Sequence, residues 1–322
     1  MLIKIILFIV GLTIITKGAD LLVDGAQALA KKFKISDLII GLTVIAFGTS
    51  LPEFFVSFNA TIKESSEIAI GNVVGSNIAN IFLVLGVCAI ITPLIVREKT
   101  VSREIPFCLL SAIILALLGN DYFLDNASHS YLGKIDGLIL LVFFGIFFYN
   151  IVSDSIKSRN IKITLPLKPM SFNKIILFLV IGFFCLFAGS KLIVDNAIYI
   201  ARSLKISQSL IALTIIAVGT SLPELVTSIV ATMKKNTDIA VGNIIGSNIF
   251  NTFFILGFCA NINPLTIDHT KDNLDIIVSI FASLLLFIFM FTGKKKYLLE
   301  RWEGMLFIIF YICYIITIIY RN

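Results

Sequence analysis

Hydrophobic residues are grouped into long runs along this chain, and short polar segments separate the runs. The runs are roughly 17–25 residues long, which is the length that crosses a bilayer as an α-helix. This pattern predicts an all-α integral membrane protein with ten transmembrane helices. We expect them at about residues 2–30, 38–62, 70–92, 104–119, 135–153, 174–200, 209–233, 240–262, 275–292 and 303–320.

Two motifs of the first half recur in the second half, both at a spacing of 171 residues. The segment Gly48–Glu53 recurs as Gly219–Glu224, and Gly71–Asn77 recurs as Gly242–Asn248. Over residues 41–80 the two copies are identical at 23 of 40 positions without a gap, far more than chance would give. The sequence therefore predicts an internal duplication.

Each copy contains five of the expected helices. Because five is an odd number, the second copy must enter the membrane from the opposite side, which predicts an inverted-topology pair. The chain then divides into an N-terminal five-helix repeat at residues 1–153, a short basic cytoplasmic linker at 154–173 and a C-terminal inverted repeat at 174–322.

The lysines and arginines between the helices are divided unequally between the two faces of this arrangement. One face carries 17 of them and the other carries 7. Since cytoplasmic loops carry the excess of positive charge, the face with 17 is predicted to be cytoplasmic and both termini are predicted outside. The net charge of +6 is thereby explained by membrane orientation, and nucleic-acid binding is not expected.

Composition and cysteine spacing exclude other classes of protein. Fifty-eight per cent of the residues are hydrophobic and 14% are charged, which excludes an ordinary soluble domain. The five cysteines occur singly and no C-x-x-C is present, so neither a zinc site nor a disulfide framework is indicated.

The repeated Gly-Thr-Ser-Leu-Pro-Glu segments are expected to break helices two and seven in mid-span. Proline cannot donate to the carbonyl four residues back, and its ring crowds that carbonyl. We expect the break to free backbone carbonyls, which is tolerated at membrane depth only where the backbone is buried in protein or lines a cavity. The carbonyls concerned belong to Ala46, Thr49, Ala217 and Thr220.

A glutamate follows each predicted break, at Glu53 and at Glu224. A buried glutamate is often a partner in a structural ion pair, but neither of these two helices contains a cation. An ionisable residue inside a membrane is expensive and usually functional, so we interpret the pair as cation ligands. Charged residues of helices one and six, such as Asp20 and Asp24, are expected to form ion pairs instead.

The second repeated motif adds polar residues on one helix face. Ser76 and Asn80 are four residues apart, as are Ser247 and Asn251, so each pair could point toward the glutamates. Such a stripe could also be interhelical hydrogen bonding, but its pairing with a broken helix favours a site. The glycines of this motif are interpreted as helix-packing positions: Gly71, Gly75, Gly242 and Gly246.

The oxygen-rich set indicates a hard cation. Two ionised glutamates neutralise one divalent ion, and Ca²⁺ accepts 6–8 oxygen ligands in a flexible shell. Mg²⁺ demands octahedral geometry and loses water reluctantly, so it fits less well. Sulfur and imidazole ligands are missing from the motifs, which argues against zinc and copper.

These motifs resemble the two alpha repeats of the cation/calcium exchanger superfamily, specifically the prokaryotic sodium/calcium exchangers. The resemblance covers the whole chain. It implies two long tilted helices, the first and sixth, that slide against an eight-helix core, and four ion positions with calcium in the middle. It places calcium on Glu53, Glu224, Thr49 and Thr220. An outer sodium position is implied at Ala217, Thr220, Ser221, Ser76 and Glu53; an inner one at Ala46, Thr49, Ser50, Ser247 and Glu224; and the middle position on both glutamates with Asn80 and Asn251.

One position departs from the pattern of this family. Well-studied members carry aspartate where this chain has Asn251, although some bacterial relatives also have asparagine there. Two glutamates already balance the charge of one Ca²⁺, so the change need not abolish calcium binding. It does leave the exchange ratio and the driving ion open.

Several functions are compatible with these features. The first is an antiporter of the prokaryotic inner (plasma) membrane that exchanges calcium for sodium by alternating access, exports calcium and acts as a monomer without a cofactor. The second is a proton-driven antiporter on the same scaffold. A cation channel is a third, although channels place an acidic ring around an axis between subunits. An enzyme is not expected, because no nucleophile–base pair accompanies the glutamates.

Overall fold

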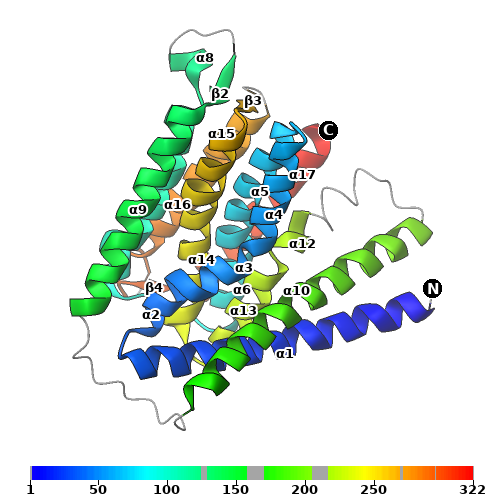
Figure 1. Cartoon of the computed structure of the whole chain (residues 1–322), viewed down its shortest axis with the longest axis vertical. Coiled ribbons are helices and arrows are strands. Elements are labelled where there is room, and N and C mark those ends of the chain that lie inside the picture. Colours follow the sequence, from blue (N-terminus) through cyan, green and yellow to red (C-terminus); the bar gives the residue numbers. More distant parts are fainter. Residues whose placement is uncertain are drawn as a thin grey trace.

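The chain folds into a bundle of long helices with two short antiparallel strand pairs at opposite ends, as the computed structural model in Figure 1 shows. The structure describes residues 2–124, 129–157, 170–204, 217–268, 271–293 and 295–321. Most of the expected linker therefore lies outside the described residues, as do residues 209–216 of the expected seventh helix.

Eight helices within the described ranges are long and apolar enough to cross a membrane, or nine if one bent pair is counted as a single span. The bent pair runs from Asp37 to Ile62 and turns by 45° at Ser50, so the predicted break in helix two is confirmed. The eight are α1 (Leu2–Phe33), α5–η2–α6 (Ser66–Ile91), η3–α7 (Thr100–Leu118), α9 (Lys134–Lys157), α10 (Phe172–Ser203), α14–η5–α15 (Thr237–Ile262), α16 (Asp272–Phe289) and α17 (Arg301–Arg321).

Shorter elements complete the bundle. The bent pair consists of α2 (Asp37–Ile40), the π-helical turn η1 (Gly41–Ile45), α3 (Ala46–Thr49) and α4 (Leu51–Ile62). The counterparts described in the second half are α12 (Ala217–Thr220) and α13 (Leu222–Met233), and α8 (Asp121–Leu124) follows α7. The strands are β1 (Leu94–Ile95), β2 (Ser130–Leu132), β3 (Leu265–Ile267) and β4 (Leu298–Leu299).

The strands mark the two faces of the bundle. β1 pairs antiparallel with β4 through Leu94 and Leu299, and β2 pairs antiparallel with β3 through Tyr131 and Thr266. The β2–β3 pair lies at the top of Figure 1 and β4 lies at the opposite end. We refer to these ends as the β2–β3 face and the β1–β4 face.

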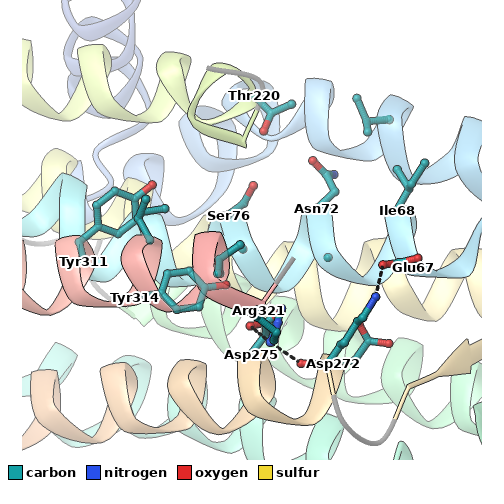
Figure 2. A pocket seen from close by; sticks show the side chains of 16 residues that line it. Glu67, Ile68, Asn72, Ser76, Thr220, Asp272, Asp275, Tyr311, Tyr314 and Arg321 are labelled. Carbon is teal, nitrogen blue, oxygen red and sulfur yellow. Dashed lines mark hydrogen bonds and ion pairs between the residues drawn. The ribbon is translucent and has the colours of Figure 1, made fainter. Parts of the chain in front are cut away.

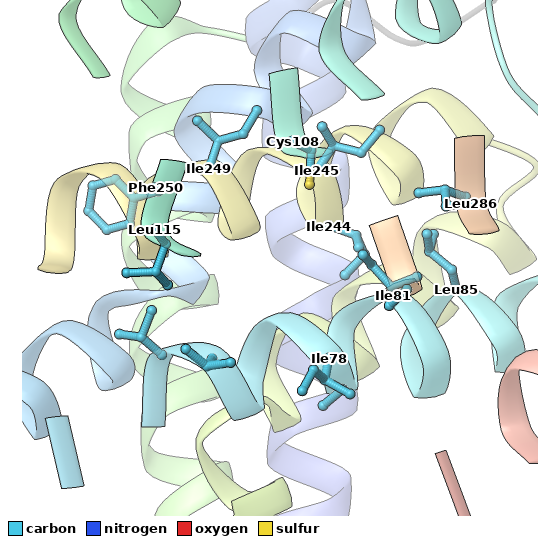
Figure 3. Packing of buried hydrophobic residues seen from close by; sticks show 14 of the residues in the cluster. Ile78, Ile81, Leu85, Cys108, Leu115, Ile244, Ile245, Ile249, Phe250 and Leu286 are labelled. Carbon is cyan, nitrogen blue, oxygen red and sulfur yellow. The ribbon is translucent and has the colours of Figure 1, made fainter. Parts of the chain in front are cut away.

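The two most buried helical segments, α5–η2 and α14–η5, cross at the centre of the bundle. Ile78 and Ile81 of the first pack near Ile244 and Ile245 of the second, and α7 and α16 cover them (Figure 3). The sequence places branched aliphatic side chains on both contacting faces, so the centre is tightly filled and rigid. The motif asparagines are therefore held on well-packed elements.

Helices α1 and α10 lie side by side and run obliquely across the rest of the bundle (Figure 1). Their close approach depends on glycine: a Cβ on Gly18 would lie 3.0 Å from the Gly182 carbonyl oxygen, and one on Gly189 would lie 2.7 Å from the Ile15 nitrogen. Lys234, at the end of α13, pairs with Asp24 at 2.6 Å and Asp20 at 3.3 Å. The expected ion pairing of these two aspartates is confirmed.

Candidate ion-binding site

The two Gly-Thr-Ser-Leu-Pro-Glu segments interrupt their helices at equivalent residues. Ser50, between α3 and α4, has φ −84° and ψ 7°, and Ser221, between α12 and α13, has φ −85° and ψ 7°. In each copy the proline occupies the first turn of the following helix, where a missing N–H costs nothing. Each glutamate consequently lies in the first turn of a helix that begins inside the bundle.

The carbonyl of Ala46 corrects one expectation about this break. It accepts hydrogen bonds from the Ser50 N–H at 3.0 Å and from the hydroxyls of Thr49 at 3.3 Å and Ser247 at 3.4 Å. The prediction that the break leaves this carbonyl without a backbone partner is wrong, because the helical hydrogen-bond ladder continues as far as Ser50.

The carboxyl groups of Glu53 and Glu224 are fully buried and are bonded across the two halves of the chain. The Ser50 hydroxyl donates to Glu224 Oε1 at 3.0 Å, and the Ser221 hydroxyl donates to Glu53 Oε1 at 3.4 Å. The Ser76 hydroxyl also donates to Glu53 Oε1 at 3.4 Å. Each glutamate is thus held by the serine that precedes the other, which brings both carboxylates to one place.

Four asparagines form a second cross-linked set beside the carboxylates. The Asn248 amide donates to the Asn77 backbone carbonyl at 3.2 Å, which leaves Asn248 Oδ1 to accept from Asn80 at 2.9 Å. The Asn251 amide donates to Asn77 Oδ1 at 3.2 Å, while Asn77 donates to the Thr252 hydroxyl at 2.8 Å. Because a backbone carbonyl can only accept, the orientation of the Asn248 and Asn80 amides is fixed by the network.

Four oxygens of this assembly are buried and have no hydrogen-bond partner. They are Glu53 Oε2, Glu224 Oε2, Asn80 Oδ1 and Asn251 Oδ1, and all four residues are fully buried. Buried polar atoms are almost always satisfied, so a matched set from both halves requires an explanation. Within the described part of the chain, no lysine or arginine pairs with either glutamate. A desolvated cation would satisfy the oxygens and neutralise the carboxylates.

A cavity of about 460 Å³ extends from Ser76 and Thr220, at the edge of this assembly, to Lys271 at the β2–β3 face. Figure 2 shows Ser76 and Asn72 of α5 with Thr220 of α12 on one side of it, and Asp272, Asp275 and Arg321 on the other. The cavity gives water-sized molecules a route to Ser76, which contacts Glu53.

Two of the motif glycines line this cavity. An added Cβ at Gly71 or Gly75 would meet no atom within 4 Å, so the prediction that these two pack against a helix is wrong. Gly242 and Gly246 do pack as predicted, because an added Cβ at these positions would lie only 2.9 Å and 2.6 Å from the carbonyl oxygens of Leu38 and Leu42. At the repeat spacing of 171, the counterparts of these leucines are positions 209 and 213, outside the described residues.

The sequence-based interpretation missed Asn72 and Asn243, the second residue in each copy of the second motif. The Asn72 amide donates to the Glu53 carbonyl at 3.0 Å and to the Ser57 hydroxyl at 2.9 Å. The Asn243 amide contacts the Glu224 carbonyl at 3.5 Å, and Asn243 Oδ1 accepts from the Thr49 hydroxyl at 3.0 Å. Both asparagines are duplicated at the same spacing as the glutamates, and that signal could have identified them.

The side chain of Ala217 lies outside the described part of the chain.

Comparison with known proteins shows the family of this chain. A family model described as sodium/calcium exchanger protein matches residues 3–152 and 174–320. The chain belongs to the sodium/calcium exchanger protein family. It is 37% identical over 316 residues to the putative antiporter CaxA of Alkalimonas amylolytica, covering 98% of each chain. It is 33% identical over 349 residues to the sodium/calcium exchanger MaX1 of Methanosarcina acetivorans, covering 99% of each.

A solved structure has the same fold. The sodium-calcium exchanger NCX_Mj, soaked with zero Na⁺ and Ca²⁺, matches with a TM-score of 0.83 and 34% sequence identity, covering 98% of this chain and 99% of NCX_Mj. Family membership and the apolar helices together make this chain a multi-pass membrane protein of an exchanger family.

Proposed function

We propose that this protein is a secondary antiporter that exchanges calcium for sodium at the paired glutamates. One observation carries the proposal. Two carboxylates, one from each copy of the repeat, are buried together, and each has an oxygen without a hydrogen-bond partner. Among the described residues, no cationic side chain pairs with either carboxylate. Two negative charges balance one Ca²⁺, and the neutral amide oxygens complete a hard-oxygen set suited to Ca²⁺ or Na⁺. The family to which the chain belongs supports the same exchange.

The ligand set that we propose is the one implied by the family resemblance. Calcium binds the two glutamates with the Thr49 and Thr220 carbonyls, and the middle position uses both glutamates with Asn80 and Asn251. The outer sodium position uses Glu53 with Ala217, Thr220, Ser221 and Ser76, and the inner one uses Glu224 with Ala46, Thr49, Ser50 and Ser247. The reciprocal serine–glutamate hydrogen bonds support this assignment, since a serine already beside a carboxylate can turn to an ion there.

We further propose ten transmembrane helices in two inverted repeats, at residues 1–153 and 174–322, joined by a cytoplasmic linker. The equivalent breaks at Ser50 and Ser221 support the repeat, and the 17 basic residues support placing the β1–β4 face in the cytoplasm. In this orientation the 460 Å³ cavity opens to the outside. The protein then acts as a monomer of the prokaryotic plasma membrane.

Alternating access and calcium export complete the proposal. Two inverted halves can exchange conformations and so expose one site to either side. Helices α1 and α10 are the moving pair, supported by their oblique packing against the rest of the bundle. Three Na⁺ with two carboxylates leave a charge of +1 and one Ca²⁺ leaves none, so exchange at that ratio carries current.

Calcium uptake into proteoliposomes under sodium, potassium and pH gradients in turn tests the function. Uptake that saturates with calcium and follows an imposed sodium gradient is expected. Uptake that follows a pH gradient without sodium would favour the proton-driven antiporter. Asn251, in place of the aspartate of well-studied members, leaves the driving ion open. Uptake that needs no counter-ion and does not saturate would indicate a channel.

A further inference from the structure

The contact between α1 and α10 is symmetric under the internal repeat. At the spacing of 171 residues that relates the first helices of the two halves, Gly11 corresponds to Gly182 and Gly18 corresponds to Gly189. A Cβ on Gly11 would lie 3.1 Å from the Gly189 carbonyl oxygen, and a Cβ on Gly18 would lie 3.0 Å from the Gly182 carbonyl oxygen. The repeat converts one contact into the other, so this helix pair is unchanged if the two halves exchange conformations.

The contacts of this helix pair with the rest of the bundle are not symmetric. Helix α1 packs along α13, and Val23 and Ala26 of α1 share a buried cluster with Val230 of α13. The two α1 residues recur on α10 as Val194 and Ala197, yet the described part of α10 makes no comparable contact with α4. The structure therefore shows one of the two docking arrangements that the repeat allows.

The surface of α4 that corresponds to the covered face of α13 is an open groove. It has a volume of about 350 Å³, lies between α4 and the start of α5, and is lined by Val56, Lys63 and Ile68 among others. Val56 is 37% exposed and Ile68 is 57% exposed, whereas their counterparts Thr227 and Ile239 are fully buried. This groove is therefore where α10 would lie if the two halves exchanged conformations.

Charged residues beside the groove fit the same docking. Lys234, directly after α13, contacts Asp24 of α1 at 2.6 Å. Their counterparts are Lys63, directly after α4, and Asp195 of α10. Both counterparts are exposed, and among the described residues neither belongs to an ion pair. The repeat thus pairs a lysine and an aspartate that are separated in this structure.

Docking of a long helix accompanies closure of the site on the same side. At the β1–β4 face, where α1 is docked, the Leu38 backbone of α2 covers Gly242. At the β2–β3 face, where α10 is not docked, the counterpart Gly71 lines the open 460 Å³ cavity. The groove and this cavity share Val56 and Ile68, so a helix in the groove would stand beside the mouth of the cavity.

We propose that Lys63 and Asp195 form an ion pair when α10 docks in the groove on α4, and that this pair stabilises the state in which the site is closed at the β2–β3 face. The proposal rests on the alternating access proposed above. Lys63 and Asp195 are then positioning residues of the transport cycle, because they hold a helix and contact no transported ion.

The two ion pairs are unequal, which biases the cycle. Asp20 of α1 also contacts Lys234, at 3.3 Å, so this lysine lies between two carboxylates. The counterpart of Asp20 is Lys191, so Lys63 would meet one carboxylate and one like charge. An exposed ion pair changes an equilibrium by about two- to fivefold. The charges therefore favour the arrangement with α1 docked, which is the one in the structure.

Reversible cross-linking of the full-length protein in proteoliposomes tests the contact. With Cys185 and Cys313 replaced by alanine, Lys63→Cys is combined with Asp195→Cys or, as a control, with Phe184→Cys. Phe184 lies about three turns from Asp195 along α10, so a short bifunctional methanethiosulfonate should join only the first pair. The cross-link should stop sodium-driven calcium uptake, because α10 can no longer leave the groove, and reduction should restore uptake.

The parental protein separates the two ways in which this test can fail. If the parent exchanges calcium for sodium, then a first pair that does not cross-link, or equal cross-linking of both pairs, would overturn the inference and leave the antiporter function standing. A parent that does not exchange the two ions would contradict the proposed function and, with it, this inference.

A charge substitution tests the ion pair without a cross-linker. Val56→Cys in the same cysteine background should react with an impermeant maleimide only while α10 is undocked, because the counterpart Thr227 is fully buried. Lys191→Asp gives Lys63 a second carboxylate, so it should raise the ratio of docked to undocked protein about two- to fivefold and slow the labelling. Adding Lys63→Gln should restore the parental rate. An unchanged rate in Lys191→Asp, or slow labelling that persists without Lys63, would overturn the ion pair.

Discussion

At the scale of single residues, the site is defined by which oxygens lack a partner. The sequence predicted the glutamates together with Asn80 and Asn251, because duplicated polar residues stand out within apolar helices. It could not show that Asn77 and Asn248 orient the amides of Asn251 and Asn80, since this depends on contacts between segments 171 residues apart in the chain.

Replacing Asn251 by aspartate should make calcium transport more dependent on pH. The Asn251 amide donates to Asn77 Oδ1, so an ionised carboxylate at this position would place two acceptors against each other, and the carboxyl group of the introduced aspartate should therefore keep its proton at low pH. Loss of that proton adds a negative charge, so the apparent calcium affinity should rise with pH, by up to about tenfold per unit. Uptake assays at several pH values measure this.

The matched control is Asn59→Asp, the same change on the exposed part of α4. This variant should keep the parental pH profile. An Asn251→Asp protein whose profile is also unchanged would show that the residue contributes no oxygen to the ion.

At the scale of helices and strands, the break after Thr49 followed from proline chemistry, and the apolar runs located the long helices. Two details could not be predicted from the sequence. The Ala46 carbonyl keeps its backbone partner, the Ser50 N–H. Pro52 removes only the helical hydrogen bond to the carbonyl four residues before it, at Gly48. Gly71 and Gly75 face a cavity, which no local pattern distinguishes from helix packing.

Enlarging Gly189 should slow transport by separating α1 from α10. A Cβ there would lie 2.7 Å from the Ile15 nitrogen and 3.0 Å from the Gly11 carbonyl oxygen, both backbone atoms. Overpacking of this kind costs roughly 1–3 kcal/mol, so Gly189→Leu should lower the melting temperature and the initial rate of sodium-driven calcium uptake.

Gly145→Leu on α9 provides the control, because a Cβ there meets no atom within 4 Å. This variant should transport calcium at the parental rate. Equal, undiminished rates in both variants would mean that close contact between α1 and α10 is not needed for exchange.

At the scale of the whole molecule, the distribution of basic residues predicts the orientation in the membrane. With Cys185 and Cys313 replaced by alanine, a cysteine at position 63 should react with an impermeant maleimide in intact cells. A cysteine at position 295, on the β1–β4 face, should react only after permeabilisation. The reverse pattern would contradict the orientation that the charge count predicts.

The most direct test of the paired-carboxylate site is sodium-driven calcium uptake by Glu53→Gln and Glu224→Gln in proteoliposomes, with the exposed Glu64→Gln as control. Either substitution leaves one carboxylate for a divalent ion, so uptake should fall to the level of protein-free liposomes while Glu64→Gln transports normally. Circular dichroism and gel filtration establish that each variant is folded. Normal uptake by a folded Glu53→Gln or Glu224→Gln protein would contradict the account.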